Sequence, residues 1–183
     1  MGNVMIDIET FSSEIDARII QIGAVRFELG SAGIKDHFIV NINPECVDNC
    51  KRSESSLTME FWDRQPQGVK DTWFLTSRVG LKLALLKLSA YVKTNDCVWA
   101  NPVSFDLAIL RHAYKQVDLK VPWHHRGERD CRTQWNLLPI PGRKWVMDQC
   151  REDVVLEHYA LADAMQQAKW VQLGYVWAKV NTW

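Results

Sequence analysis

Two acidic side chains interrupt the first apolar run of the chain. Asp7 and Glu9 alternate with apolar residues over positions 4–9, which is the pattern of a β-strand. Side chains two apart on a strand point to the same side, roughly 7 Å from each other, so both carboxylates face one surface. Such a pair is typical of a solvated edge strand, but on a largely buried strand the two acids repel each other and need a cation. Their oxygen ligands favour Mg²⁺ or Mn²⁺ over Zn²⁺.

Two further segments supply candidate partners for this pair. Asp106 opens a predicted helix directly after a second strand, where a crevice at the sheet edge would bring its carboxylate near Asp7. His158 precedes Asp163 by five positions, and five helical residues turn roughly 500°, so the two side chains converge only if His158 lies at or before the helix start. Taken singly, Asp106 fits a helix N-terminal acid and His158 a satisfied polar residue. Taken together with Asp7 and Glu9, these residues favour a metal site.

The elements that must position these residues follow from hydrophobic periodicity. Runs at 18–29 and 34–43, separated by the glycine-containing turn 30–33, predict an antiparallel hairpin. Residues 53–94 are predicted to be helical, 96–100 a buried strand, 104–117 a helix and 159–179 a long helix. The segment 120–155, rich in Pro, Arg and Trp, supports no assignment. This order predicts an α/β fold: a mixed sheet of about five strands with an initial antiparallel hairpin, then βα units, and helices on its faces.

Composition limits the class of protein. The chain has 183 residues, of which 47% are apolar and 24% charged, which predicts a single domain over residues 1–183. No apolar stretch approaches the ~20 residues that span a bilayer, and the N-terminus has no secretory pattern, so we expect no membrane association and a cytoplasmic location. Five cysteines are an odd number, which argues against a disulfide framework. The spacing between the cysteines and histidines that could bind zinc matches no common structural zinc site; these residues are Cys46, Cys50, Cys131, His124 and His125.

The net charge leaves nucleic-acid binding open. The 22 basic and 22 acidic residues cancel, whereas proteins that bind phosphates usually carry an excess of basic residues. A metal site that neutralised four carboxylates would leave the rest of the chain with a surplus of four positive charges. Composition therefore neither requires nor excludes a nucleic acid as partner.

The combined pattern resembles the DEDDh family of 3′→5′ exonucleases, which includes polymerase proofreading subunits. Asp7-x-Glu9, Phe105-Asp106 and His158-x4-Asp163 match the three motifs of that family in order and spacing. The segments 19–25, 99–101, 105–111 and 130–133 are similar to a branch that contains a mycobacterial exoribonuclease, phage exonuclease A and prophage proteins labelled exonuclease VIII. Two departures, Pro102-Val103-Ser104 before the second motif and Leu107 in place of a common Asn, concern the substrate groove.

The resemblance implies a fold, a reaction and a set of roles. The fold would be ribonuclease-H-like, and the reaction would release nucleoside 5′-monophosphates from the 3′ end of DNA or RNA. Two Mg²⁺ ions, which Mn²⁺ would replace, would be held by Asp7, Glu9, Asp106 and Asp163. His158 would take the proton of the attacking water, a role that suits an imidazole at neutral pH.

Substrate contacts and assembly also follow from the resemblance. The expected substrate-binding residues are Thr10, Phe11, Trp62, Asn101 and Phe105. Thr10, Phe11, Trp62 and Phe105 could each belong to the core instead, and for Trp62 the two interpretations are evenly balanced. For Arg132 a structural ion pair is favoured over a phosphate contact. The apolar side of the last helix that carries Trp170 and Trp177 would be core or a subunit interface, and because such relatives are often dimers we expect a possible homodimer.

Two other functions could be built on the same fold. A non-catalytic nucleic-acid-binding module on the same fold would have no evident reason to keep four converging carboxylates. A ribonuclease-H-type endonuclease shares the acids, but the spacing of His158 and Asp163 favours the exonuclease. The sequence does not distinguish DNA from RNA or single from double strands.

Overall fold

The structure is a computed structural model that describes residues 2–31, 33–151 and 157–181. Its centre is a six-stranded sheet in the order β4-β3-β2-β1-β5-β6. The strands are β1 (Asn3–Thr10), β2 (Ile19–Phe27), β3 (Ile34–Ile42), β4 (Arg78–Val79), β5 (Cys97–Ala100) and β6 (Glu128–Asp130). The helices are α1 (Ser56–Arg64), α2 (Gln67–Phe74), α3 (Leu81–Tyr91), α4 (Asp106–Gln116), α5 (Cys131–Leu137), α6 (Ile140–Cys150), α7 (Ala160–Asn181) and the short 3₁₀ helix η1 (His125–Gly127).

The sheet is mixed, as predicted. β1 pairs antiparallel with β2 and β2 with β3, whereas β5 runs parallel to β1 and β6 parallel to β5. Gly30 and Gly33 in the turn before β3 have φ of 79° and 93°, a region that glycine occupies without steric cost. Because β1, β5 and β6 are parallel, their carboxyl ends lie at the same edge of the sheet, which is where ligands bind in open α/β sheets.

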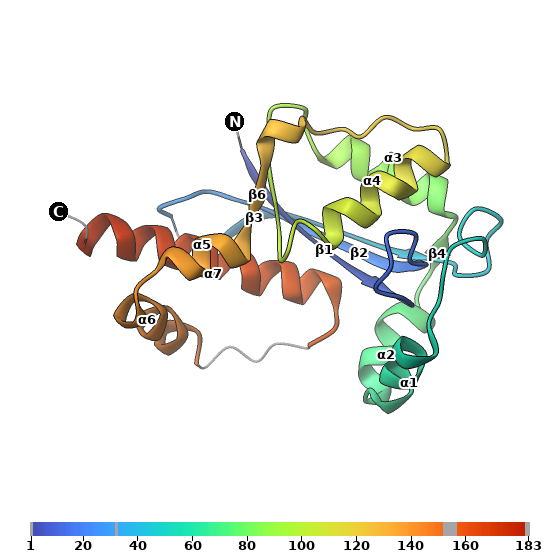
Figure 1. Ribbon diagram of the computed structural model, residues 1–183, viewed down its shortest axis with the longest axis horizontal. Coiled ribbons are helices and arrows are strands. Elements are labelled where there is room, and N and C mark those ends of the chain that lie inside the picture. The colour runs from blue at the N-terminus through green and yellow to red at the C-terminus, as the bar shows by residue number, and fades with distance from the viewer. Residues whose placement is uncertain (1, 32, 152–156, 182–183) are drawn as a thin grey trace.

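Helices cover both faces of the sheet (Figure 1). On one face α3 and α4 pack against Val4, Ile6 and Ile8 of β1, all almost fully buried. On the other face α7 packs against Met5, the neighbour of these residues in the alternating pattern, together with strands β2 and β5. The strand alternation therefore turns Asp7 toward the α7 face.

The predicted helical region 53–94 is three helices and a short strand. Ser55 caps α1, its Oγ accepting from the backbone N–H of Thr58 at 3.2 Å. Pro66 stands before α2 and Gly80 before α3, and β4 lies between these two helices. Proline has no N–H for a continuing helix and glycine is a poor helix former, so these two residues break the run.

The sheet has six strands instead of about five. β4 has two residues and β6 has three, and β6 consists of Glu128, Arg129 and Asp130. Such strands are too short for periodicity, and an all-charged segment carries no apolar alternation. Both are edge strands, where short length and charge discourage pairing with other chains.

The unassigned segment 120–155 supplies η1, β6, α5 and α6, and α5 and α6 pack on α7. The ring of Trp170 lies 5.9 Å from that of Trp135 on α5, and Trp177 fills the space beside Gly142 on α6. The tryptophan side of α7 therefore packs within the chain. Within the described ranges, no helix is long and apolar enough to cross a membrane.

Candidate active site

A cleft of about 340 Å³ opens at the carboxyl end of β1. Its walls come from β1, from the start of α4 and from the start of α7, three segments far apart in the sequence. All five residues predicted to carry the chemistry line this one cleft: Asp7, Glu9, Asp106, His158 and Asp163.

The two carboxylates of β1 lie in a strongly acidic and buried environment. Asp7 is 9% exposed, and its Oδ1 accepts a hydrogen bond from Gln167 Nε2 on α7 at 2.8 Å. Burial raises the pKa of Asp7 well above its ordinary value, and the nearby charges of Asp106, Glu9 and Asp163 raise it further. Burial, followed by the charges of Asp163 and Asp106, likewise raises the pKa of Glu9.

Asp106 is the first residue of α4 and faces β1. Its Oδ1 accepts from the backbone N–H of Ile8 at 3.1 Å, while within the described residues its buried Oδ2 has no partner. Burial raises the pKa of Asp106 to about 7, although the Ile8 N–H opposes the shift. A buried carboxylate oxygen without a donor, beside three other acids, is the arrangement that a divalent cation would satisfy. The residues present therefore fit a metal centre.

Strand β2 fixes where α7 begins. Gly23 lies opposite Asp7 in the ladder, and a Cβ at Gly23 would lie 2.3 Å from the carbonyl carbon of Ala160. Beside it, the buried Oε1 of Gln21 accepts from the Ala160 N–H at 2.8 Å. Gln21 Nε2 in turn donates to Asn41 Oδ1 on β3 at 2.7 Å. The missing side chain and this polar relay let the first turn of α7 rest directly on the sheet.

His158 lies two residues before α7, in a left-handed backbone conformation with φ of 59°. This position outside the helix allows it to meet Asp163, as the helical geometry required. One ligand atom from each of Glu9, His158 and Asp163 lies within 4.8 Å of the other two. Burial raises the pKa of Asp163 and the His158 charge opposes that shift. The ring of His158 also packs edge-on against Phe61 of α1, with centroids 4.8 Å apart.

The family of the chain follows from its sequence over nearly its full length. Residues 2–175 match the family model of the 3′–5′ exoribonuclease Rv2179c-like domain. The chain belongs to this exoribonuclease family. The family model describes a 3′–5′ exoribonuclease domain, a class of enzymes that hydrolyse phosphodiester bonds. Among curated proteins, no sequence matches the chain significantly.

Solved exonucleases share the fold of this exoribonuclease-family chain. The zinc-bound form of the E. coli ExoI–ssDNA complex matches with a TM-score of 0.68 at 14% identity, covering 94% of this chain and 40% of that chain. The nuclease domain of 3′hExo, a DEDDh family member bound to rAMP, matches with a TM-score of 0.60 at 16% identity over 92% of this chain and 88% of that one. The chain thus spans 40% of the length of ExoI. These matches confirm the predicted ribonuclease-H-like mixed sheet.

The five predicted substrate contacts divide into two groups. Asn101 and Phe105 line the acidic cleft. Thr10, Phe11 and Trp62 lie beside it, each less than a tenth exposed, and Trp62 Nε1 donates to the Thr10 carbonyl at 2.8 Å. Phe11 and Trp62 belong to an aromatic cluster beneath α1 and α2 and border a separate cavity of about 260 Å³.

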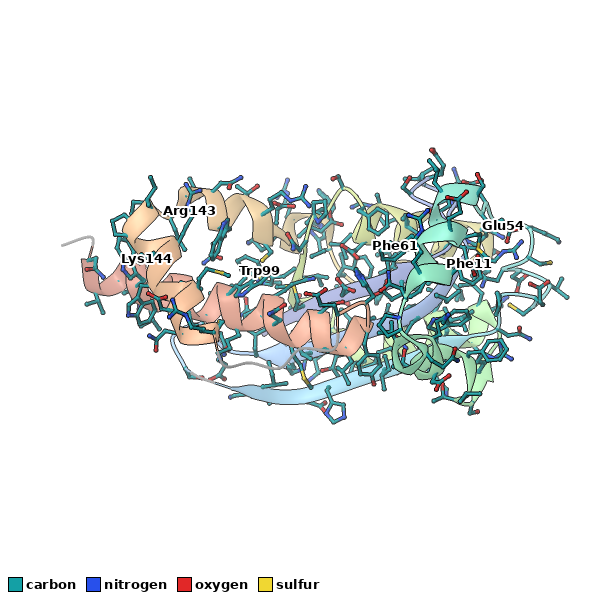
Figure 2. The ribbon with its side chains drawn as sticks, turned by 90° about the horizontal axis from the view of Figure 1, so that it is seen from below. Phe11, Glu54, Phe61, Trp99, Arg143 and Lys144 are labelled. Atoms are coloured by element: carbon teal, nitrogen blue, oxygen red, sulfur yellow. The ribbon has the colours of Figure 1, made fainter. Side chains whose placement is uncertain are left out.

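Phe61, the neighbour of Trp62 on α1, also packs against His158. It is 37% exposed, and its ring contacts both Trp62 and His158. The ring of Trp62 lies 6.4 Å from that of His158, so both aromatic residues of α1 pack around the histidine. Figure 2 labels Phe61 on α1.

The ion pair favoured for Arg132 is not present in the described parts of the chain. The ion pairs there involve other arginines and lysines, and Arg132 is exposed. Arg132 instead lines a second cavity that adjoins the acidic cleft. The position of Arg132 follows from β6. This strand ends at Asp130, which pairs with Ala100 of β5, so α5 begins at the same edge of the sheet as the acids.

Three positioning residues were not foreseen: Gln21, Gly23 and Gln167. The signal for Gln167 was present, because it follows Asp163 by one helical turn and must share its face. Gln21 and Gly23 stand in the segment that carried the resemblance, but their role depends on which helix packs against β2. That contact joins remote parts of the chain, because Gln21 and Ala160 are 139 positions apart.

Proposed function

We propose that this chain removes nucleotides one at a time from the 3′ end of RNA, using two Mg²⁺ ions held by Asp7, Glu9, Asp106 and Asp163. The observation that carries the proposal is the convergence of these four carboxylates and His158 on one cleft, with the buried Asp106 Oδ2 lacking a donor in the described residues. The family's description as exoribonucleases supports RNA as the substrate.

The acids are suited to binding cations because, in the described parts of the chain, none of the four forms an ion pair with an arginine or lysine. The neutral amide of Gln167 donates to Asp7, whose pKa is raised by burial and then by the charges of the other acids. When bound, divalent cations would lower the pKa of an attacking water and offset the charge that develops on the phosphate. Mg²⁺ and Mn²⁺ both prefer such oxygen ligands.

His158 is placed to move the proton. In the proposed reaction the water oxygen forms a bond to phosphorus while the bond from phosphorus to the 3′ oxygen of the preceding nucleotide breaks. A ring nitrogen of His158 takes the water proton, and the departing 3′ oxygen gains a proton. The products are a nucleoside 5′-monophosphate and a strand one nucleotide shorter with a new 3′ hydroxyl. The ring of His158 packs edge-on against Phe61, and one of its nitrogens lies within 4.8 Å of a carboxylate oxygen of Asp163.

Single-stranded DNA is the second candidate substrate. The ExoI structures that share this fold were solved with ssDNA or an oligodeoxynucleotide. Discrimination between RNA and DNA depends on contacts to the 2′-hydroxyl. Matched DNA and RNA oligonucleotides digested side by side therefore decide between the two.

The test uses RNA labelled at its 5′ end and incubated with Mg²⁺. We expect a ladder that shortens from the 3′ end, release of nucleoside 5′-monophosphates, and no cleavage after EDTA treatment or in Asp163→Asn. Asp148→Asn, which changes an exposed carboxylate of α6, is the matched control and should retain activity. Internal cuts would indicate an endonuclease, and binding without cleavage would indicate a binding module; either result overturns the proposal.

The homodimer and the cytoplasmic location stay predictions. The tryptophan side of α7 is covered by α5 and α6, so a subunit interface would have to use another surface. Sedimentation equilibrium of the purified chain measures the oligomeric state directly.

A further inference from the structure

A second cavity of about 300 Å³ adjoins the acidic cleft and shares Asn101 and Trp170 with it. Its remaining lining residues come from the start of α5 and from α6: Cys131, Arg132, Trp135 and Met147. On α7, Asp163, Gln167 and Trp170 follow one helical face, so the second cavity lies about 10 Å further along that helix than Asp163. The two cavities are therefore neighbours along α7.

Arg132 gives the second cavity a positive charge. Among the described residues that line the two cavities, it is the one arginine or lysine. Its guanidinium is exposed and, in the described chain, makes no ion pair. A guanidinium has planar paired donors that match the oxygens of a phosphate.

The other walls of the second cavity are aromatic. The rings of Trp135 and Trp170 have centroids 5.9 Å apart and planes inclined by 44°. Trp170 Nε1 is buried and has no acceptor among the described residues. Tryptophan faces are surfaces on which nucleic-acid bases stack irrespective of sequence. A cationic fork beside apolar rings matches a nucleotide, which has an anionic phosphate and a flat base.

We propose that the second cavity binds the nucleotide on the 5′ side of the scissile bond, with Arg132 donating to that nucleotide's own 5′ phosphate and Trp135 and Trp170 packing against its base. This inference rests on the proposed function, because the acidic cleft must hold the scissile phosphate. The strand then lies along α7, with its terminal nucleoside on the α1 side of the acids and the rest of the strand on the α5 side. Arg132 supplies a positive charge beside the phosphate of that nucleotide.

The test combines a change in the protein with a change in the substrate. A methylphosphonate replaces the linkage immediately 5′ of the scissile bond, which removes one negative charge. For the wild-type chain with Mg²⁺, we expect this to lower kcat/KM by about ten- to a hundredfold, the range of a charge-assisted hydrogen bond. Arg132→Gln should show the same loss on the unmodified strand and no further loss on the methylphosphonate strand.

Two controls separate this subsite from the catalytic cleft. Arg126→Gln removes an exposed arginine at the opposite end of β6 and should behave as wild type. The p-nitrophenyl ester of thymidine 5′-monophosphate has a scissile bond but no upstream phosphate, so Arg132→Gln should hydrolyse it at the wild-type rate. Equal losses on this ester and on the oligonucleotide, or a methylphosphonate effect that persists in Arg132→Gln, would overturn the subsite.

A binding measurement makes the outcome independent of catalysis. Fluorescence anisotropy of a labelled strand with Ca²⁺ in place of Mg²⁺ should show weaker binding for Arg132→Gln and for Trp135→Leu, with circular dichroism confirming that both variants are folded. If the variants bind more weakly than wild type but wild type never cleaves, the proposed function is wrong, although the cavity still binds the strand. If it cleaves but neither variant binds more weakly, the subsite is wrong and the proposed function holds.

Discussion

Gly23 on β2 lies in contact with the backbone of Ala160, the first residue of α7, and a Cβ there would lie 2.3 Å from the Ala160 carbonyl carbon. Gly23 is also the ladder partner of Asp7. The close approach therefore occurs beside Asp7. Because His158 and Asp163 flank Ala160, it also brings these two residues close to Asp7. The distance between the sheet and α7 is set by the absence of one side chain.

Gly23→Ala should push α7 away from the sheet. We expect a loss of about 1–3 kcal/mol in the free energy of unfolding, because backbone atoms cannot yield to the added methyl group, and a loss of Mn²⁺ affinity because Asp163 moves. Urea denaturation and Mn²⁺ titration measure the two effects. Gly68→Ala is the control: nothing lies within 4 Å of its added Cβ, and alanine in α2 should leave the chain as stable or up to about 1 kcal/mol more stable.

Gln167→Leu should weaken metal binding without unfolding the chain. The substitution removes the side-chain amide that donates to Asp7 Oδ1, a hydrogen bond of 2.8 Å in a buried environment. Groups that orient a metal ligand typically contribute about ten- to a hundredfold in affinity, so we expect the Kd for Mn²⁺ to rise by at least tenfold. Calorimetric titration measures it, with the exposed Gln149→Leu as the matched control. An unchanged Kd would show that Gln167 does not position Asp7.

His158→Ala separates a base from a ligand. As a general base, His158 should contribute about 10²–10⁴-fold to kcat while the affinities for Mn²⁺ and for RNA stay close to wild type. Its ring also lies within 4.8 Å of ligand atoms of Glu9 and Asp163, the geometry of a metal ligand. Mn²⁺ titration alongside the rate measurement distinguishes the two roles, because loss of one metal ion from the titration would assign His158 as a ligand.

The metal-free chain should become less stable as the pH rises. Burial raises the pKa of Asp106 from its ordinary value of 3.8 to about 7, so between these values the folded state holds a proton that the unfolded state has released. The free energy of unfolding therefore falls as pH increases from about 4 to about 7. Urea midpoints at pH 5 and pH 7.5 in EDTA test this. Asp106→Asn should reduce the dependence, and Mg²⁺ should raise the midpoint more at pH 7.5 than at pH 5.

Long periodic elements and the chemistry of the site could be predicted from sequence. The strand around Asp7 and the helix that follows His158 have apolar patterns long enough to identify, and the acids are unusual enough on apolar elements to indicate a cation. Short elements could not be found this way. The three residues of β6 are all charged, so they show no apolar alternation. In the region 53–94, the periodicity predicted helix throughout and did not show that Pro66 and Gly80 separate three helices.

The sequence by itself determined which groups take part: four carboxylates and a histidine in three motifs, with the alternation of β1 turning Asp7 and Glu9 to one face. Only the tertiary structure decided how they meet, that Phe61 and Trp62 pack against His158, and that Arg132 lines a cavity beside the cleft. The physical reason is that residue type and local period are encoded over a few neighbouring positions. The approach of α7 to Gly23, by contrast, is set by packing between segments that are remote in the chain.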